Sequence, residues 1–144
     1  MNFKIPKIIR PITLTDYAPE MVHDDGPDAG KPSAVYVWVN PPALLLTRHG
    51  ELRAQASRAN KQLTTAASDK AALSAVAQEL SSVGGGLAPL YAELWSQHAD
   101  AQTHWTTQDV LDLANNEANP ALFGWLTSRT IMAINDHRAG LRKN

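Results

Sequence analysis

One stretch, residues 103–130, most constrains how this chain can fold, because it contains two helix starts in succession. Thr106 is followed three residues later by Asp109, the spacing of a capping box with a carboxylate at its third helical position. Trp105 and Val110 occupy the two positions of a hydrophobic staple, which fixes the angle at which the chain enters the helix. The sequence therefore predicts a helix from Thr107 to about Glu117.

A second helix start follows directly. Asn119 and Pro120 predict it, since asparagine caps helices well and proline suits the first helical position. The helix should run to about Ala139 and end at Gly140. Its expected buried face has helical spacing and consists of Phe123, Leu126, Thr130, Ile131 and Ile134.

The N-terminal part, residues 7–39, predicts a β-hairpin. Residues 7–14 are rich in β-branched side chains, and Pro11 among them indicates an edge strand, because proline lacks the amide proton of a central strand. Residues 34–39 alternate between two apolar faces and form the best strand of the chain. The connection at 15–33 contains glycine and proline throughout and predicts a long loop, with one helical turn near Asp16 and Tyr17.

Two more helices are expected between the hairpin and Thr106. Asn40 should cap the first, which runs to about Leu63, and Ser68 the second. Three glycines at 84–86 should stop the second helix and form a hinge, after which Pro89 opens a short helix. The fold class is thus α+β within one domain, residues 1–144: a small N-terminal antiparallel hairpin and a mostly α-helical part at about 41–140.

The composition of the chain argues against several classes of function. The net charge is −1 and no basic stripe is present, so the sequence does not predict a nucleic-acid-binding protein. The chain has no cysteine, which excludes disulfides and thiolate chemistry and fits a cytoplasmic protein. No apolar run approaches the roughly 20 residues that span a bilayer, so we expect no membrane partner.

Catalytic motifs are not recognisable, and we expect neither an enzyme nor a cofactor. His98, Asp100 and His104 are the tightest group of possible metal ligands, and a small metal-dependent enzyme using them is the alternative hypothesis. Asp24, Asp25 and Asp28 resemble a fragment of a calcium loop, but they lack its alternating ligand pattern and its closing glutamate. A solvated acidic turn is the simpler interpretation.

Partner binding is the remaining class. Residues 106–129 could form a DNA-binding helix-turn-helix, but the second helix would begin with side chains that cannot hydrogen-bond to base edges. Trp125 lies beside the expected buried face, with Leu122 and Arg129 at neighbouring helical spacing. A large ring flanked by a leucine and an arginine is typical of an interface anchor, for a partner protein or for self-association.

Three blocks carry a family resemblance: IIRPITLTDYAPE, VYVWVNPPALL and HWTTQDVLDLANNEANPALFGWLTSRT. Together they resemble the tail assembly chaperones of long-tailed phages and prophages. The resemblance implies a small, mostly helical, non-enzymatic protein of the host cytoplasm. Such a protein would hold the tape-measure protein and help tail-tube subunits polymerise around it, and some members also have a longer, frameshifted form. The long N-terminal loop and the three glycines depart from a simple helical chaperone.

Overall fold

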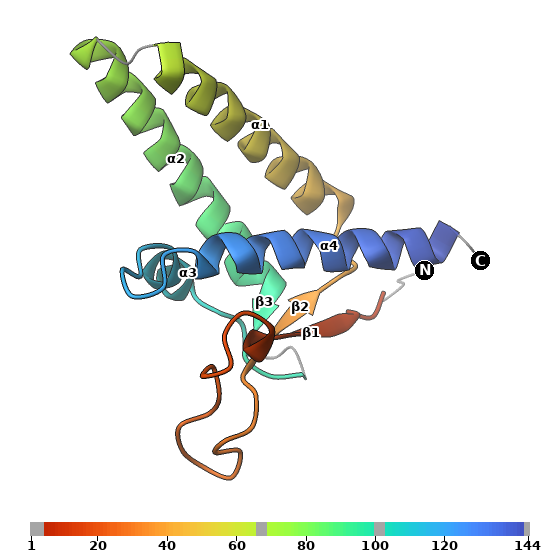
Figure 1. Cartoon of the computed structure of the whole chain (residues 1–144). Helices are drawn as coiled ribbons and strands as arrows, with labels where there is room; N and C mark the ends of the chain where they lie inside the picture. Colours follow the sequence, from red (N-terminus) through yellow and green to blue (C-terminus); the bar gives the residue numbers. More distant parts are fainter. Residues whose placement is uncertain (1–4, 66–68, 100–102, 143–144) are drawn as a thin grey trace.

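A three-stranded antiparallel sheet lies at the centre of the molecule (Figure 1). In the computed structural model, which describes residues 5–65, 69–99 and 103–142, strand β1 (Ile9–Thr13) pairs with β2 (Ala34–Trp38), and β2 also pairs with β3 (Trp95–Ser96). The predicted hairpin is confirmed, and Pro11 lies on an edge strand as expected. Strand β3 was not predicted, because a strand of two residues directly after a helix has no periodic pattern.

Helices α1 (Ala43–Thr65) and α2 (Lys70–Leu94) form a long antiparallel hairpin, called here the arm, that projects from the sheet (Figure 1). Within the arm, the two helices bury an apolar seam of small and medium side chains that is separate from the main core. The seam consists of Leu52, Ala59, Val76 and Val83. This seam supplies the burial that lets the arm extend beyond the rest of the molecule.

The start of α1 differs from the prediction. Asn40 does not cap the helix: its side chain accepts a hydrogen bond from the Ile8 amide at 2.7 Å and donates one to the Pro6 carbonyl at 2.9 Å. It therefore fastens the N-terminal segment to the end of β2. The helix begins two residues after Pro41, where the Pro42 carbonyl accepts a hydrogen bond from the Leu45 amide at 3.0 Å.

The predicted glycine stop is wrong, since α2 continues through residues 84–86 and contains Pro89 in its interior. A Cβ atom added to Gly86 would lie 3.0 Å from a methyl carbon of Leu52, so glycine here allows α1 and α2 to approach closely. Packing against α1 thus outweighs the low helix propensity of these residues. The cap of α2 is the side chain of Asp69, which accepts from the Ala71 amide at 3.0 Å; Ser68 lies outside the described residues.

The two C-terminal helices follow the prediction more closely. Helix α3 (Thr107–Ala114) begins with the expected capping box: the Asp109 amide donates to the Thr106 hydroxyl at 3.1 Å, and the Thr106 amide donates to the Asp109 carboxylate at 2.9 Å. Helix α4 (Leu122–Arg142) begins slightly later than predicted, with the Leu122 amide bonded to the backbone carbonyl of Asn119. It passes through Gly140, so the predicted stop there is also wrong.

The main core lies between the sheet, the C-terminal end of α2, and helices α3 and α4. Its centre is Trp95, which is fully buried and packs against the rings of Tyr91 and Trp105 at centroid distances of 4.8 and 5.2 Å. The indole nitrogen of Trp95 donates to the Thr130 hydroxyl at 2.9 Å, and that hydroxyl donates to the Leu126 carbonyl at 2.8 Å. A buried threonine in the predicted apolar face of α4 is therefore explained by its hydrogen bonds.

The segment between β1 and β2 begins with a 3-10 turn, η1 (Leu14–Asp16), close to the predicted helical turn. It then forms a narrow exposed loop on the side of the sheet opposite the arm (Figure 1). A bridge between Val22 and Pro32 closes the loop, and Gly26 and Gly30 take positive φ angles of 76° and 81° at its tip. Among the helices that the structure describes, none is both long and apolar enough to cross a membrane.

Candidate functional site

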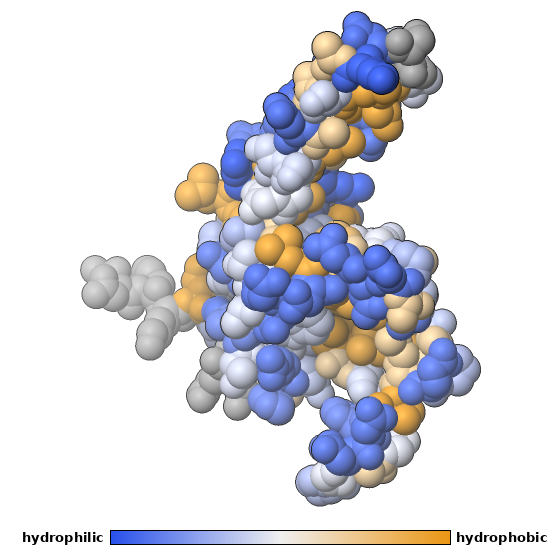
Figure 2. Space-filling model, turned by 90° about the vertical axis from the view of Figure 1, so that its left-hand side faces the viewer, coloured by the Kyte–Doolittle hydropathy of each residue, from blue (hydrophilic) through white to orange (hydrophobic). Residues whose placement is uncertain are grey.

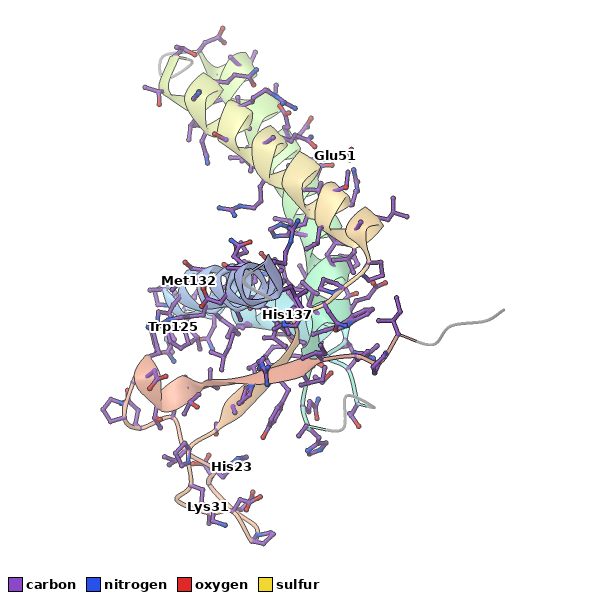
Figure 3. The ribbon with its side chains drawn as sticks, turned by 90° about the vertical axis from the view of Figure 1, so that its right-hand side faces the viewer. His23, Lys31, Glu51, Trp125, Met132 and His137 are labelled. Carbon is purple, nitrogen blue, oxygen red and sulfur yellow. The ribbon has the colours of Figure 1, made fainter. Side chains whose placement is uncertain are left out.

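The predicted interface anchor is divided between core and surface. Leu122 is only 4% exposed and belongs to the interior, so it cannot serve as a surface contact in this conformation. Trp125 is half-buried, and its ring lies 5.4 Å from that of Tyr17, on the face of α4 directed toward η1 (Figure 3). The guanidinium carbon of Arg129 lies 5.3 Å from the Trp125 ring centroid, within cation–π range. Trp125 therefore already has partners within its own chain.

The metal-ligand candidates are partly described. His98 and His104 are exposed, whereas Asp100 lies outside the described residues. The His104 imidazole lies 3.4 Å from the amino group of Lys7. Within the described part of the chain, no three histidine, aspartate or glutamate side chains are placed to hold a metal ion.

The acidic turn is an exposed part of the loop between β1 and β2. Asp24 and Asp25 lie at its tip, and Asp28 forms a salt bridge with Lys31 at 3.4 Å. An exposed pair of this kind contributes little to stability. The acidic residues are thus solvated, as the simpler interpretation predicted.

The start of α4, which would be the recognition helix of a helix-turn-helix, packs inward. Phe123 lies 6.0 Å from the ring of Tyr91 and 6.3 Å from that of Trp95, in edge-to-face arrangements typical of an aromatic core. Together with the buried Leu122, it directs the first turn of α4 toward the core. This packing accounts for the apolar start of the helix without a role in base recognition.

A cleft of about 750 Å³ lies between the arm and α4. Figure 3 looks nearly along α4 and shows the angle between this helix and the arm, with Met132 on α4 and Glu51 on the far side of the arm. In Figure 2 the arm stands out from the rest of the molecule, and apolar side chains where the two meet are bordered by hydrophilic ones. The volume is within the range of ligand sites, roughly 300–1,000 Å³.

Each of three helices contributes one wall of this cleft. Helix α1 supplies small and polar side chains with two basic ones, Arg53 and Lys61. Helix α2 supplies Leu87 and Tyr91 at the base. Helix α4 supplies a mixed wall of Phe123, Thr127, Ser128, Ile131 and Met132. The cleft therefore has an apolar base and one cationic wall.

The charge of the cleft is uncompensated. No acidic residue lines it, and neither Arg53 nor Lys61 forms a salt bridge with any residue that the structure describes. The acidic residue of α1, Glu51, is paired with Arg48 at 3.6 Å, outside the cleft lining. Both cations are exposed on one face of α1, eight positions or about two turns apart. They are available to a ligand that carries negative charge.

At the base of the cleft, Tyr91 is hydrogen-bonded to His49, with 2.8 Å between the phenol oxygen and the imidazole Nε2. Burial lowers the pKa of His49, and the nearby Arg53 lowers it further. Burial raises the pKa of Tyr91 to about 12, against the opposing effects of Arg53 and a hydrogen bond with Thr127. Both groups are thus neutral near pH 7. The pair joins α1 to α2 and offers no activated nucleophile.

Comparisons with known proteins add no relative: no protein family, no curated sequence and no solved structure matches this chain. The site must be interpreted from its own residues. Sequence reasoning missed the cleft, although the α1 residues that line it recur at the regular helical spacing of 53, 56, 57, 60, 61 and 64. A helix face of small, polar and basic residues predicts a solvated surface. This face of α1 becomes a wall of the cleft only because α4 lies across from it.

Proposed function

We propose that this chain is an assembly factor of the phage tail assembly chaperone type, which acts by transient binding of a partner protein and not by catalysis. The observation that carries the proposal is the cleft between the arm and α4, with its apolar base and its two free cations. The resemblance of the three sequence blocks supplies the partner class, namely the tape-measure and tail-tube proteins. The neutral His49–Tyr91 pair is in keeping with a site for binding.

Co-expression tests this function. The chain is produced with the tape-measure and tail-tube proteins encoded near its own gene, and complexes are isolated through a tag on the chain. We expect one of the two proteins to be retained, and the chain to be missing from finished tails. If neither protein is retained, or if neighbouring genes encode no tail protein, the assembly function is refuted.

A blocking substitution tests the location of the site. Ser57 is an exposed residue of the cleft wall, so Ser57→Trp should fill part of the cleft and reduce partner retention without changing the melting temperature. Ser74→Trp is the matched control, because Ser74 is exposed on α2 and does not line the cleft. Equal retention by the two variants would place the binding surface elsewhere.

A further inference from the structure

We infer that the cleft between the arm and α4 binds an amphipathic helix of a partner protein, with carboxylate side chains along the edge that faces α1. This inference rests on the proposed function and deepens it, since it names the chemistry of the bound segment. Its three supports are the secondary structure of the walls, the apolar base and the spacing of the cations.

The walls favour a helical ligand. All three belong to the helices α1, α2 and α4, whose backbone groups are bonded within each helix. None of the described residues that line the cleft belongs to a strand, so an extended segment would enter without partners for its own amides and carbonyls. A helix satisfies its backbone internally and presents only side chains, which suits a groove between helices.

The base favours an apolar face on that helix. At the base Leu87 is half-buried and Tyr91 is buried, and on the adjoining α4 wall Phe123 and Ile131 are half-buried and Met132 is 50% exposed. Methionine is flexible and polarisable, and it adapts to apolar partners of different shape. Covering these side chains removes apolar surface from water, which stabilises a complex that polar contacts alone would leave weak.

The cations define the charged edge of the ligand. Arg53 and Lys61 are separated by a rise of about 12 Å along α1. A helix packed alongside α1 would match them with aspartate or glutamate residues seven or eight positions apart. Because the described residues of the lining include no acidic side chain, Arg53 and Lys61 would repel a basic ligand.

Three labelled model peptides test the inference by fluorescence anisotropy. The first is an 18-residue helix with a leucine face and glutamates seven positions apart along one edge (the length follows the roughly 12–15 residues below which isolated helices are marginal). The second has lysine in place of each glutamate. The third keeps the glutamates but has serine in place of each leucine. We expect measurable binding of the first peptide only, weakening as salt is raised.

Charge reversal provides the decisive variant. Arg53→Glu with Lys61→Glu should weaken binding of the glutamate peptide by about tenfold, since two ion pairs are lost, and it should create binding of the lysine peptide. Arg10→Glu with Arg58→Glu is the matched control, because both side chains are exposed and neither lines the cleft. A melt of each variant confirms that it is folded.

Several outcomes would overturn the inference. The inference is overturned if the glutamate peptide does not bind, or if the serine peptide binds as tightly as the glutamate peptide. It is also overturned if the charge-reversed variant does not prefer the lysine peptide to the glutamate peptide. The proposed function can fail separately. If the charge-reversed chain retains tail proteins as well as the parent does, the assembly function stands and the assignment of the ligand is refuted. If charge reversal changes the preferred peptide from glutamate to lysine but no tail protein is retained, the assignment of the ligand stands and the assembly function is refuted.

Discussion

The glycines within α2 provide a sharp test of the arm. A Cβ atom added to Gly84 meets nothing within 4 Å, whereas one added to Gly86 would lie 3.0 and 3.2 Å from the two methyl carbons of Leu52. Alanine stabilises an exposed helix interior by about 1 kcal/mol relative to glycine. Gly84→Ala should therefore raise the free energy of unfolding by about 1 kcal/mol and the melting temperature by about 3 °C.

Gly86→Ala has the same gain in helix propensity but adds a close contact. Carbon atoms pack best at about 3.5–4.0 Å, so the buried side chain of Leu52 must move, and overpacking of a core typically costs about 1–3 kcal/mol. The free energies of unfolding of the two alanine variants should then differ by about 1–3 kcal/mol, with Gly86→Ala the less stable protein. Leu52→Ala should cost less in the Gly86→Ala background than alone, because the added methyl group occupies part of the cavity.

Urea unfolding followed by tryptophan fluorescence measures all four variants. Equal stabilisation by Gly84→Ala and Gly86→Ala would show that α1 and α2 do not approach closely at this point. A destabilising Gly84→Ala would be more serious. It would mean that these glycines break the helix, as the sequence pattern had predicted, and that the arm is not continuous.

Three further predictions follow from individual contacts. Thr106→Ala removes one hydrogen bond of the capping box and should lower the free energy of unfolding by about 1 kcal/mol in the same urea assay; no change would contradict the cap. The pKa of His49 is lowered in the folded state, so its contribution to stability is present above pH 6.5 and is lost as the pH falls toward the folded pKa. As the pH falls below 6.5, the free energy of unfolding should therefore decrease more steeply for the parent protein than for His49→Gln, and parallel curves for the two proteins would refute this contribution of His49. Trp125→Ala should lower the free energy of unfolding by less than the roughly 3–5 kcal/mol of a fully buried tryptophan, because its ring is half-buried against Tyr17 and Arg129; a loss on that full scale would show that Trp125 is a core residue.

The features that could be predicted from the sequence are those set by local chemistry. The capping box at Thr106 needs only side chains three residues apart, and its two hydrogen bonds are present as expected. The alternation of residues 34–39 between two apolar faces predicted a strand. Val35, Val37 and Val39 on one face are buried in the core, whereas Tyr36 and Trp38 on the other face are half-buried. Such signals are contained within a few residues, so no knowledge of the remaining chain is needed.

The features that could not be predicted depend on a distant partner. Asn40 has the composition of a helix cap, but its side chain bonds to the backbone at Pro6 and Ile8, more than thirty residues earlier in the chain. Glycine at position 86 has a low helix propensity and so predicts a helix end. Within the continuous helix it is nevertheless favourable, because Leu52 of the other arm helix leaves little room for a Cβ atom there. In both cases the residue type is compatible with two local structures, and a contact with a distant part of the chain determines which of them forms.

The shape of the cleft depends on local sequence and on distant contacts at one place in α2. Toward its N-terminus this helix packs in the arm seam through Val76 and Val83, and toward its C-terminus Ala88, Tyr91 and Leu94 join the main core. The glycines lie at the change between the two packing units, and Tyr91 belongs both to the core and to the base of the cleft. Because Gly86 and Leu52 set how closely α1 approaches α2 there, they also set where Arg53, one residue further along α1, lies relative to α4. The residues that shape the arm thereby position the charged wall of the proposed binding site.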